Sequence, residues 1–316
     1  IDYENLIKQF GTKHIDAKLL KRIEKEAGEL HFMLRRKVFF SHRDIDWLLD
    51  KLDKGEKFVL YTGRGPSGDT HIGHILPWIF CKWLQDRFDT ELYFQLTDDE
   101  KFLHDDKLSQ EQTHTFAYEN ALDVIALGFD PEKTFLFTNY DYGKTMYKIA
   151  NRISKLTTFS TAKSVFGFEN DTNIGMIYFP AMQAATCFLP SELKKKKTPV
   201  LIPAAIDQDP YWRVARDVAD RLGYYKPAAI HCRFLPGLQG PDSKMSASKP
   251  DSAIFTTDTP KDARRKIMRS FSGGAPSLEE HRKHGGNPDV DTAYQYLSNV
   301  FEEDDERIRE VHDAYK

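Results

Sequence analysis

The sequence predicts an α/β protein whose core is a parallel, five-stranded, doubly wound sheet, with an N-terminal appendage and a partial C-terminal α-helical domain. Three observations lead to this prediction. The chain has 316 residues, about twice the commonest domain size. From residue 57 onward, short apolar runs alternate with helical patterns, which is the order of a doubly wound sheet. After residue 259 the pattern becomes polar and helical.

The composition narrows the class of protein. There are 45 Lys and Arg against 48 Asp and Glu, and the net charge of −3 argues against a strongly basic nucleic-acid wrapper while leaving room for a local basic face. Three cysteines without a CxxC pair predict a reducing, cytoplasmic setting. No apolar run approaches the roughly 20 residues that span a bilayer, so no membrane contact is expected. The start at Ile1 instead of Met favours a piece of a longer protein.

Residues 1–56 are predicted to form the appendage. A helix is expected over 16–27, because apolar residues recur there at helical spacing between Lys and Glu. Ser41 is predicted to cap a second helix, since its hydroxyl can accept a hydrogen bond from a free amide at a helix start. That helix is expected to end at Gly55.

Residues 57–258 are predicted to form the domain that carries the sheet. Its expected strands are apolar on both faces and cover 58–62, 92–97, 134–138, 199–203 and 229–234. Ligands of such sheets bind beyond the carboxyl ends of the strands, so the candidate site is expected there.

The clearest helix is predicted over 209–222, where Tyr211, Val214 and four further apolar residues form one stripe. Residues 139–197 interrupt the alternation with a mainly helical pattern, which indicates an insertion between the two halves of the sheet. Residues 259–316 are predicted to be the partial helical domain.

Three glycines after the first strand match a dinucleotide-binding pattern. Gly63, Gly65 and Gly68 fit G-x-G-x-x-G, and Asp89 lies about 20 residues on, where an acidic residue could hold a ribose. In that fingerprint the helix begins within the motif, whereas here Pro66 interrupts it. The sequence therefore favours another use of this loop.

The alternative centres on the HIGH sequence of residues 71–74. A helix that begins near His71 would place His71 and His74 on one face, at the end where free amides and the helix dipole favour anions. Gly73 between them would let a nucleotide approach the backbone. Pro77 predicts a late helix start or a local kink.

A second anion-binding sequence, KMSAS, follows the fifth expected strand at residues 244–248. Glycines and prolines before it indicate a mobile loop. Lys244 on such a loop can reach a leaving pyrophosphate, and the hydroxyls of Ser246 and Ser248 can bind its oxygens.

Together, HIGH after the first strand and KMSAS after the fifth resemble the paired signatures of class I aminoacyl-tRNA synthetases. YTGRGPSG, TDDEK, PAMQAA and AIDQDPYWRVARDVA resemble eukaryotic-type cytoplasmic tryptophanyl-tRNA synthetases, and the resemblance extends over nearly the whole chain. Two departures stand out. The stretch 141–147 is several residues shorter than in the family, and the chain stops at Lys316, where the family continues, so part of the C-terminal region is expected to be missing.

The resemblance implies a Rossmann-type catalytic domain and a tryptophan–tRNA ligase that uses ATP with Mg²⁺, without a structural metal in the protein. It implies catalytic roles for His71, His74, Lys244 and Ser246. It further implies that ATP is bound by Arg64, Gly65, Gly73, Lys101, Met245 and Ser248. The implied partners are L-tryptophan, tRNA(Trp) and a second copy of the chain, which would dimerise through the insertion.

For tryptophan, the resemblance assigns Tyr61 and Gln95 to the indole, whose N–H can only donate a hydrogen bond. It assigns Glu100, Gln183 and Gln208 to the α-ammonium end. Helix capping is the competing interpretation of Gln183 and Gln208.

Three alternatives stay open. A tyrosine-specific synthetase shares the scaffold and differs only in the pocket. A nucleotidylyltransferase also uses an HxGH platform, but needs neither the KMSAS loop at this distance nor a helical C-terminal region. A non-catalytic signalling fragment is the third, although intact HIGH and KMSAS sequences in one chain argue for catalysis.

Overall fold

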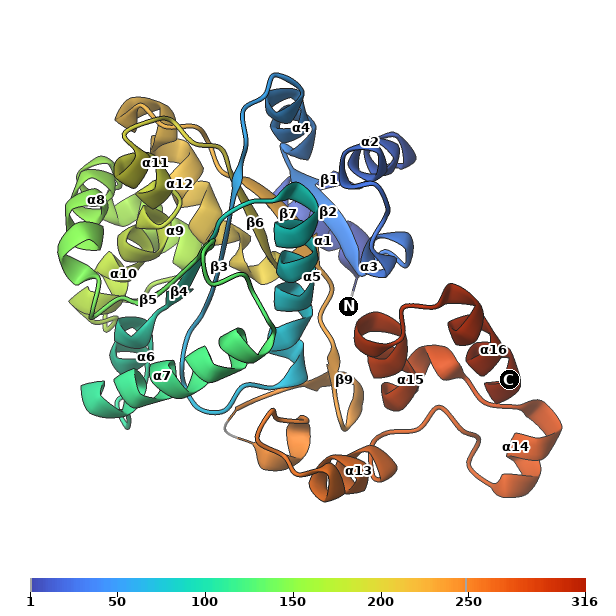
Figure 1. Ribbon diagram of the computed structural model, residues 1–316. Coiled ribbons are helices and arrows are strands. Elements are labelled where there is room, and N and C mark those ends of the chain that lie inside the picture. The colour runs from blue at the N-terminus through green and yellow to red at the C-terminus, as the bar shows by residue number, and fades with distance from the viewer. Residues whose placement is uncertain (1, 248) are drawn as a thin grey trace.

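A seven-stranded sheet forms the centre of the computed structural model, which describes residues 2–247 and 249–316 (Figure 1). The strand order is β1-β2-β7-β6-β3-β4-β5. The strands are β1 (Lys13–His14), β2 (Phe39–Arg43), β3 (Val59–Arg64), β4 (Leu92–Leu96), β5 (Thr134–Thr138), β6 (Val200–Ala205) and β7 (Ala228–Cys232). Strands β3 to β7 pair in parallel and confirm the five predicted strands.

The appendage extends this sheet, which the sequence did not predict. Strand β2 pairs antiparallel with β7, and β1 pairs antiparallel with β2. The prediction that Ser41 caps a helix is wrong, because Ser41 lies inside β2 and its Oγ is 3.0 Å from His231 Nδ1. The helix α4 (Ile45–Asp53) starts after Asp44 instead. The free edge of β7 and the apolar residues around Ser41 outweigh the local capping preference.

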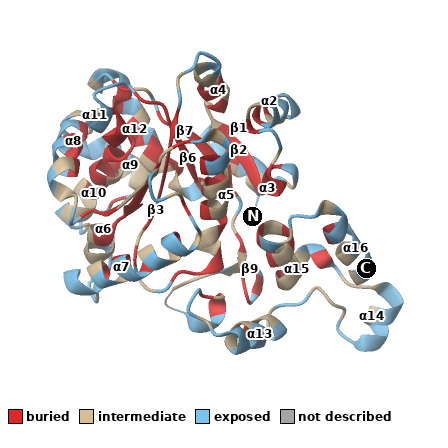
Figure 2. Cartoon of the chain, in the orientation of Figure 1, coloured by how far each residue is buried: buried red, intermediate tan, exposed pale blue. Residues whose placement is uncertain are grey.

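Helices cover both faces of the sheet (Figure 1). Alternate residues of β3 point to opposite faces, so Leu60 joins the core under α5 whereas Val59 joins the core under α8, α10 and α12. The first eight helices are α1 (Tyr3–Phe10), α2 (Ala17–Ala27), α3 (Phe32–Arg35), α4, α5 (Ile72–Phe88), α6 (Asp98–His104), α7 (Gln110–Ala126) and α8 (Gly143–Leu156). Buried residues concentrate where these layers meet (Figure 2).

Eight further helices are described after α8. They are α9 (Phe159–Phe166), α10 (Ile174–Ala185), α11 (Leu189–Lys194), α12 (Asp209–Leu222), α13 (Pro260–Met268), α14 (Leu278–His284), α15 (Thr292–Tyr296) and α16 (Asp305–Tyr315). The insertion is helical as predicted, and α12 has the predicted bounds, although Trp212 is more deeply buried than the predicted stripe residue Tyr211. No helix in the described part of the chain is both long and apolar enough to cross a membrane.

One buried ion pair ties the appendage to the sheet. The guanidinium of Arg43 on β2 donates to both carboxylate oxygens of Asp209, at 2.6 and 2.7 Å, and Asp209 is fully buried at the start of α12. Arg43 also donates to the main-chain carbonyls of Phe10 and Gly11 at the end of α1. A single side chain therefore holds both α1 and the N-terminus of α12.

Replacing Asp209 with Asn is expected to lower the free energy of unfolding by about 3–5 kcal/mol, because it leaves the Arg43 charge without its buried partner. Urea unfolding measures this change.

Lys13→Met is the matched control, since its ion pair with Asp46 has both side chains more than half exposed and should contribute less than about 1 kcal/mol. An Asp209→Asn variant as stable as this control would contradict the structural importance of the buried pair.

Candidate active site

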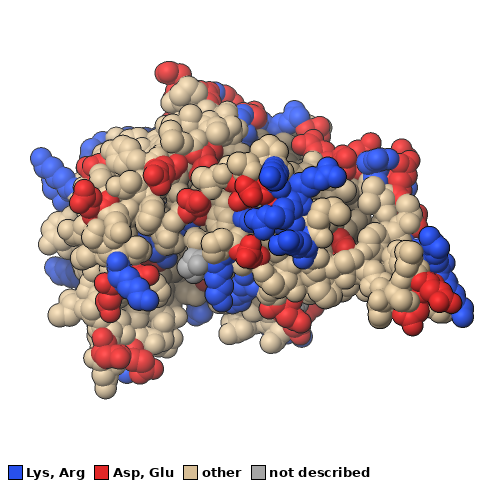
Figure 3. All heavy atoms as spheres, turned by 90° about the horizontal axis from the view of Figure 1, so that it is seen from below, with Lys and Arg blue, Asp and Glu red and all other residues tan. Residues whose placement is uncertain are grey.

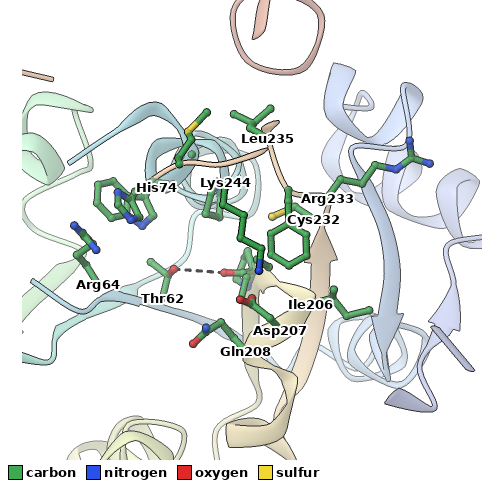
Figure 4. A pocket seen from close by; sticks show the side chains of 18 of the residues that line it. Thr62, Arg64, His74, Ile206, Asp207, Gln208, Cys232, Arg233, Leu235 and Lys244 are labelled. Atoms are coloured by element: carbon green, nitrogen blue, oxygen red, sulfur yellow. Dashed lines mark hydrogen bonds between the residues drawn. The ribbon is translucent and has the colours of Figure 1, made fainter. Parts of the chain in front are cut away.

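A cavity of about 860 Å³ opens where β3, β4, β6 and β7 end, the edge of the sheet at which a ligand was expected. Side chains from α1 and from the 289–295 region also line it, and Figure 4 shows part of its wall. The volume lies within the range of small-molecule sites. Of the predicted site residues that the structure describes, all line the cavity except Ser246. Ser248 lies outside the described residues.

The two HIGH histidines stand at the start of α5. His71 is the N-cap residue, and the rings of His71 and His74 stack with centroids 3.5 Å apart. His74 Nδ1 accepts a hydrogen bond from the main-chain N–H of His71 (3.2 Å), so neutral His74 carries its hydrogen on Nε2. The helix begins at Ile72, so the late start considered for Pro77 does not occur.

Burial and the nearby Arg64 charge lower the pKa of His71 to about 4. Burial, Arg64 and His71 likewise lower the pKa of His74. Both imidazoles are therefore neutral at pH 7, and they offer N–H donors without a positive charge.

Arg64 supplies the charge beside these rings. It ends β3 with a side chain that donates to the carbonyls of Gly65 (2.8 Å) and Asp69 (3.4 Å). Burial lowers its pKa to about 10, so the guanidinium stays cationic at pH 7. Its buried Nε has no hydrogen-bond partner among the described residues. A buried cation with an unused donor is suited to an anionic ligand.

Glu100 and Lys101 form an ion pair beside Gly65, the residue that follows Arg64. Glu100 Oε1 lies 3.0 Å from Lys101 Nζ, and Glu100 Oε2 accepts a hydrogen bond from the Thr97 hydroxyl at 2.9 Å. A Cβ at Gly65 would stand 2.3 Å from Lys101 Cε, so a side chain at this position would displace the end of the Lys101 side chain. Lys101, a predicted ATP-binding residue, thus contacts Glu100, a predicted tryptophan-binding residue.

The floor of the cavity is a chain of buried hydrogen bonds. The Tyr61 hydroxyl donates to Gln95 Oε1 (2.5 Å), Gln95 Nε2 donates to Asn139 Oδ1 (2.7 Å), and Asn139 Nδ2 donates to Asp99 Oδ1 (2.7 Å). Because the Gln95 amide nitrogen is occupied, the Gln95 oxygen is the acceptor at this floor. Burial raises the pKa of Asp99 to about 6.

The two remaining glutamines also line the cavity. Gln183 lies inside α10, so the capping interpretation of Gln183 is wrong. Gln208 occupies the N-cap position of α12, but its side chain makes no capping hydrogen bond.

Lys244 ends the strand β9 (Gly240–Lys244), which pairs with β8 (Pro236–Gly237), so the expected loop starts from a hairpin. Its side chain extends toward Asp207 (Figure 4). Met245 packs over Gly73, where a Cβ would lie 3.0 Å from Met245 Sδ. Gly73 thus permits a close approach, and in this structure the approaching group is Met245.

A family described as "tRNA synthetases class I (W and Y)" matches residues 53–316. The chain belongs to this family. It is 51% identical over 317 residues to the tryptophan–tRNA ligase of Saccharolobus solfataricus, covering 100% of this chain and 82% of that relative. It is 53% identical over 324 residues to the cytoplasmic tryptophan–tRNA ligase of Schizosaccharomyces pombe, with the same coverage of both chains.

Solved structures agree. A product-bound parasite tRNA synthetase superposes with a TM-score of 0.95 at 44% identity, and the tryptophanyl-tRNA synthetase of Plasmodium falciparum with a TM-score of 0.92 at 43% identity. Each match covers 100% of this chain and 86% of the other.

Sequence reasoning missed two site residues of this class I synthetase. Asn139 orients Gln95, and its position directly after β5 was the available signal. Asp207 lines the cavity beside Gln208; burial raises the pKa of its carboxyl, while the Lys244 charge opposes that shift. Asp207 lies within AIDQ, shortly after the predicted strand 199–203, and that position was the available signal.

Proposed function

We propose that the chain is a tryptophan–tRNA ligase, which activates L-tryptophan with ATP, releases pyrophosphate, and transfers the tryptophanyl group to the 3′ end of tRNA(Trp). The observation that carries this conclusion is one cavity that joins the HIGH histidines and the KMSAS lysine to a buried, oriented acceptor on Gln95. Relatives about 50% identical over the whole chain are curated tryptophan–tRNA ligases.

In the first step a tryptophan carboxylate oxygen bonds to the α-phosphorus of ATP, and the bond from that phosphorus to the bridging oxygen breaks. A carboxylate is already a nucleophile at pH 7, so positioning and charge stabilisation carry the step. The N–H groups of His71 and His74 donate to the phosphates, and Arg64 and Lys101 hold anionic oxygens. Lys244 and Ser246 bind the leaving pyrophosphate.

ATP is further contacted along the backbone at Gly65 and Gly73 and by Met245 and Ser248. Mg²⁺ enters as the ATP complex and adds charge neutralisation at the phosphates. Among the described residues no group of three or more His, Cys, Asp or Glu could hold a metal ion, so phosphate oxygens and water are its proposed ligands.

The indole N–H donates to Gln95 Oε1, the acceptor that Tyr61 and Asn139 orient. A tyrosine side chain placed there presents no donor at the same position, so the Gln95 oxygen keeps only its hydrogen bond from Tyr61 and loses a second one worth about 0.5–1.5 kcal/mol. Sites built on such groups reject analogues without editing.

Glu100, Gln183 and Gln208 receive the α-ammonium group. Because Glu100 pairs with Lys101 in this structure, the substrates replace each half of that pair: the ammonium faces Glu100 and phosphate oxygens face Lys101.

We propose that tRNA binds to a local basic face of the protein, although the net charge of the chain is −3. Seen from below, Lys and Arg side chains gather near the middle of the surface (Figure 3). Helix α13, which lies at the bottom of Figure 1, also carries two exposed arginines, Arg264 and Arg265.

A eukaryotic-type, cytoplasmic enzyme is the proposed subtype, supported by the 53% identity to the cytoplasmic relative of Schizosaccharomyces pombe, although archaeal relatives are almost as similar. The proposed regions are 1–56, 57–258 with the insertion 139–197, and 259–316.

A homodimer through the insertion is also proposed. Among the large apolar side chains that the insertion exposes, the most exposed are Tyr147, Phe159 and Ile174, at 56%, 53% and 84%.

Tryptophan-dependent ATP–pyrophosphate exchange tests the function. Tryptophan should support exchange and tyrosine should not. Gln95→Ala should lower kcat/KM for tryptophan by about 5- to 150-fold, as loss of one buried acceptor predicts, and should reduce the preference over tyrosine.

Gln85→Ala is the control for Gln95→Ala, because Gln85 is equally buried but bonds to Thr134 and Asp130, remote from the cavity. Exchange with tyrosine would support the tyrosine-specific alternative. No exchange with either amino acid would favour the non-catalytic signalling fragment.

Lys244→Ala should reduce the exchange rate by about 10²–10³ while tryptophan affinity stays within twofold, because the ammonium meets the phosphates only. Stopped-flow rates and calorimetric titration separate the two effects. Lys249→Ala, which removes an exposed lysine just beyond KMSAS, is the control. An equal effect of both variants would remove Lys244 from the mechanism.

Sedimentation equilibrium tests the dimer, with an expected mass of twice 36.5 kDa. Ile174→Asp should weaken the dimer at least tenfold, because it places a charge at the contact. Leu278→Asp on α14 should not, although Leu278 is also 66% exposed. A monomer at micromolar concentration would overturn the proposal.

A further inference from the structure

The segment 252–258, which follows KMSAS, is joined by main-chain hydrogen bonds to the HIGH sequence. The amide of Ile72 donates to the carbonyl of Ile254 (3.1 Å), and the amide of Thr256 donates to the carbonyl of Thr70 (2.9 Å). These bonds flank an antiparallel bridge between His71 and Phe255. The backbone on both sides of His71 therefore rests on this segment.

The same segment also holds KMSAS. Ser252, which is 4% exposed, accepts a hydrogen bond from the amide of Ser246 at 3.0 Å. Its hydroxyl donates to the carbonyl of Lys249 at 2.7 Å. One short stretch of chain thus fixes the end of KMSAS and the start of the HIGH helix relative to each other.

A buried lysine on α13, Lys266, contacts both ends of this segment. Lys266 is 6% exposed, and its ammonium lies 2.8 and 2.6 Å from the two carboxylate oxygens of Asp258 and 3.1 Å from the carbonyl of Ala253. The ammonium also lies 4.7 Å from the centre of the Phe255 ring. Asp258 in turn accepts the amide hydrogen of Phe255 at 2.8 Å.

Lysine is almost never fully buried unless it is paired, and a buried ion pair seldom adds stability over an apolar pair of similar size. The ammonium of Lys266 instead provides directional contacts. It bonds to Ala253 near the start of the segment and to Asp258 at its end, whereas an apolar side chain could only fill the space between them.

We propose that Lys266, through Asp258 and the segment 252–258, is a positioning residue that sets the placement of KMSAS relative to the HIGH histidines during ATP activation. The inference rests on the proposed function. The proposed tryptophan contacts come from β3, β4, α6, α10 and the start of α12, and none of them belongs to this segment.

Lys266→Met keeps the aliphatic stem and removes the ammonium. It should lower kcat of pyrophosphate exchange at least tenfold and leave KM for tryptophan within twofold, because misplaced phosphate ligands slow the chemical step without touching the amino acid. Lys261→Met is the matched control, since Lys261 is exposed on the same helix and should leave both constants unchanged.

Amide hydrogen exchange gives a readout that does not depend on activity. Peptides covering 69–75 and 244–258 should exchange faster in Lys266→Met than in the parent or in Lys261→Met, since the Ile72, Thr256 and Ser246 amides lose protection. Unchanged exchange would overturn the inference even if the parent chain proved inactive. A proportional loss of kcat and tryptophan binding would overturn it as well, because that pattern indicates general unfolding.

If Lys266→Met does not fold, Asp258→Asn decides the question. The carboxamide introduced by this substitution keeps an oxygen for the Phe255 amide and loses the charge that faces Lys266. A three- to tenfold loss of kcat at constant KM for tryptophan would support the positioning role, and a kcat within twofold of the parent would overturn it.

Discussion

The site depends on the parallel pairing of β3 with its two neighbours. Leu60 pairs with Leu92 on one side and with Leu201 on the other, so the carboxyl ends of three strands meet at one edge. That edge brings Tyr61, Gln95 and Gln208 into one cavity, although they come from widely separated parts of the chain. The HIGH histidines and the KMSAS lysine line the same cavity at this edge.

Charge in the cavity is held in pairs that a substrate can replace. Lys101 pairs with Glu100, and Lys244 extends toward Asp207, while the two histidines beside Arg64 are neutral. A triphosphate therefore meets two kinds of group in the cavity. The lysines already face a carboxylate, and the histidine N–H donors carry no charge. Arg64 is the exception, because its guanidinium donates to main-chain carbonyls and its buried Nε keeps an unused donor, so an anionic ligand adds a partner there.

Two buried ion pairs each join a region near one end of the chain to the rest of the structure. Arg43 with Asp209 joins the appendage to the start of α12, next to Gln208. Lys266 with Asp258 joins α13 to the segment between KMSAS and HIGH. In both cases the regions at the two ends of the chain reach into the central domain, so these regions take part in shaping the cavity.

The sequence by itself determined the alternation of strands and helices, the helix over 209–222 and the two signature motifs, because apolar periodicity and glycine-rich turns are local properties. It did not determine that β2 would add to the sheet, since the local pattern around Ser41 also suits a helix cap and only the open edge of β7 selects the strand. The positions of Asn139 and Asp207 shortly after strands were a signal, but the sequence alone could not show which groups Asn139, Asp207 and Lys266 contact. Their roles come from hydrogen bonds and ion pairs to side chains or carbonyls of other elements, and only the tertiary structure decides which of these groups meet.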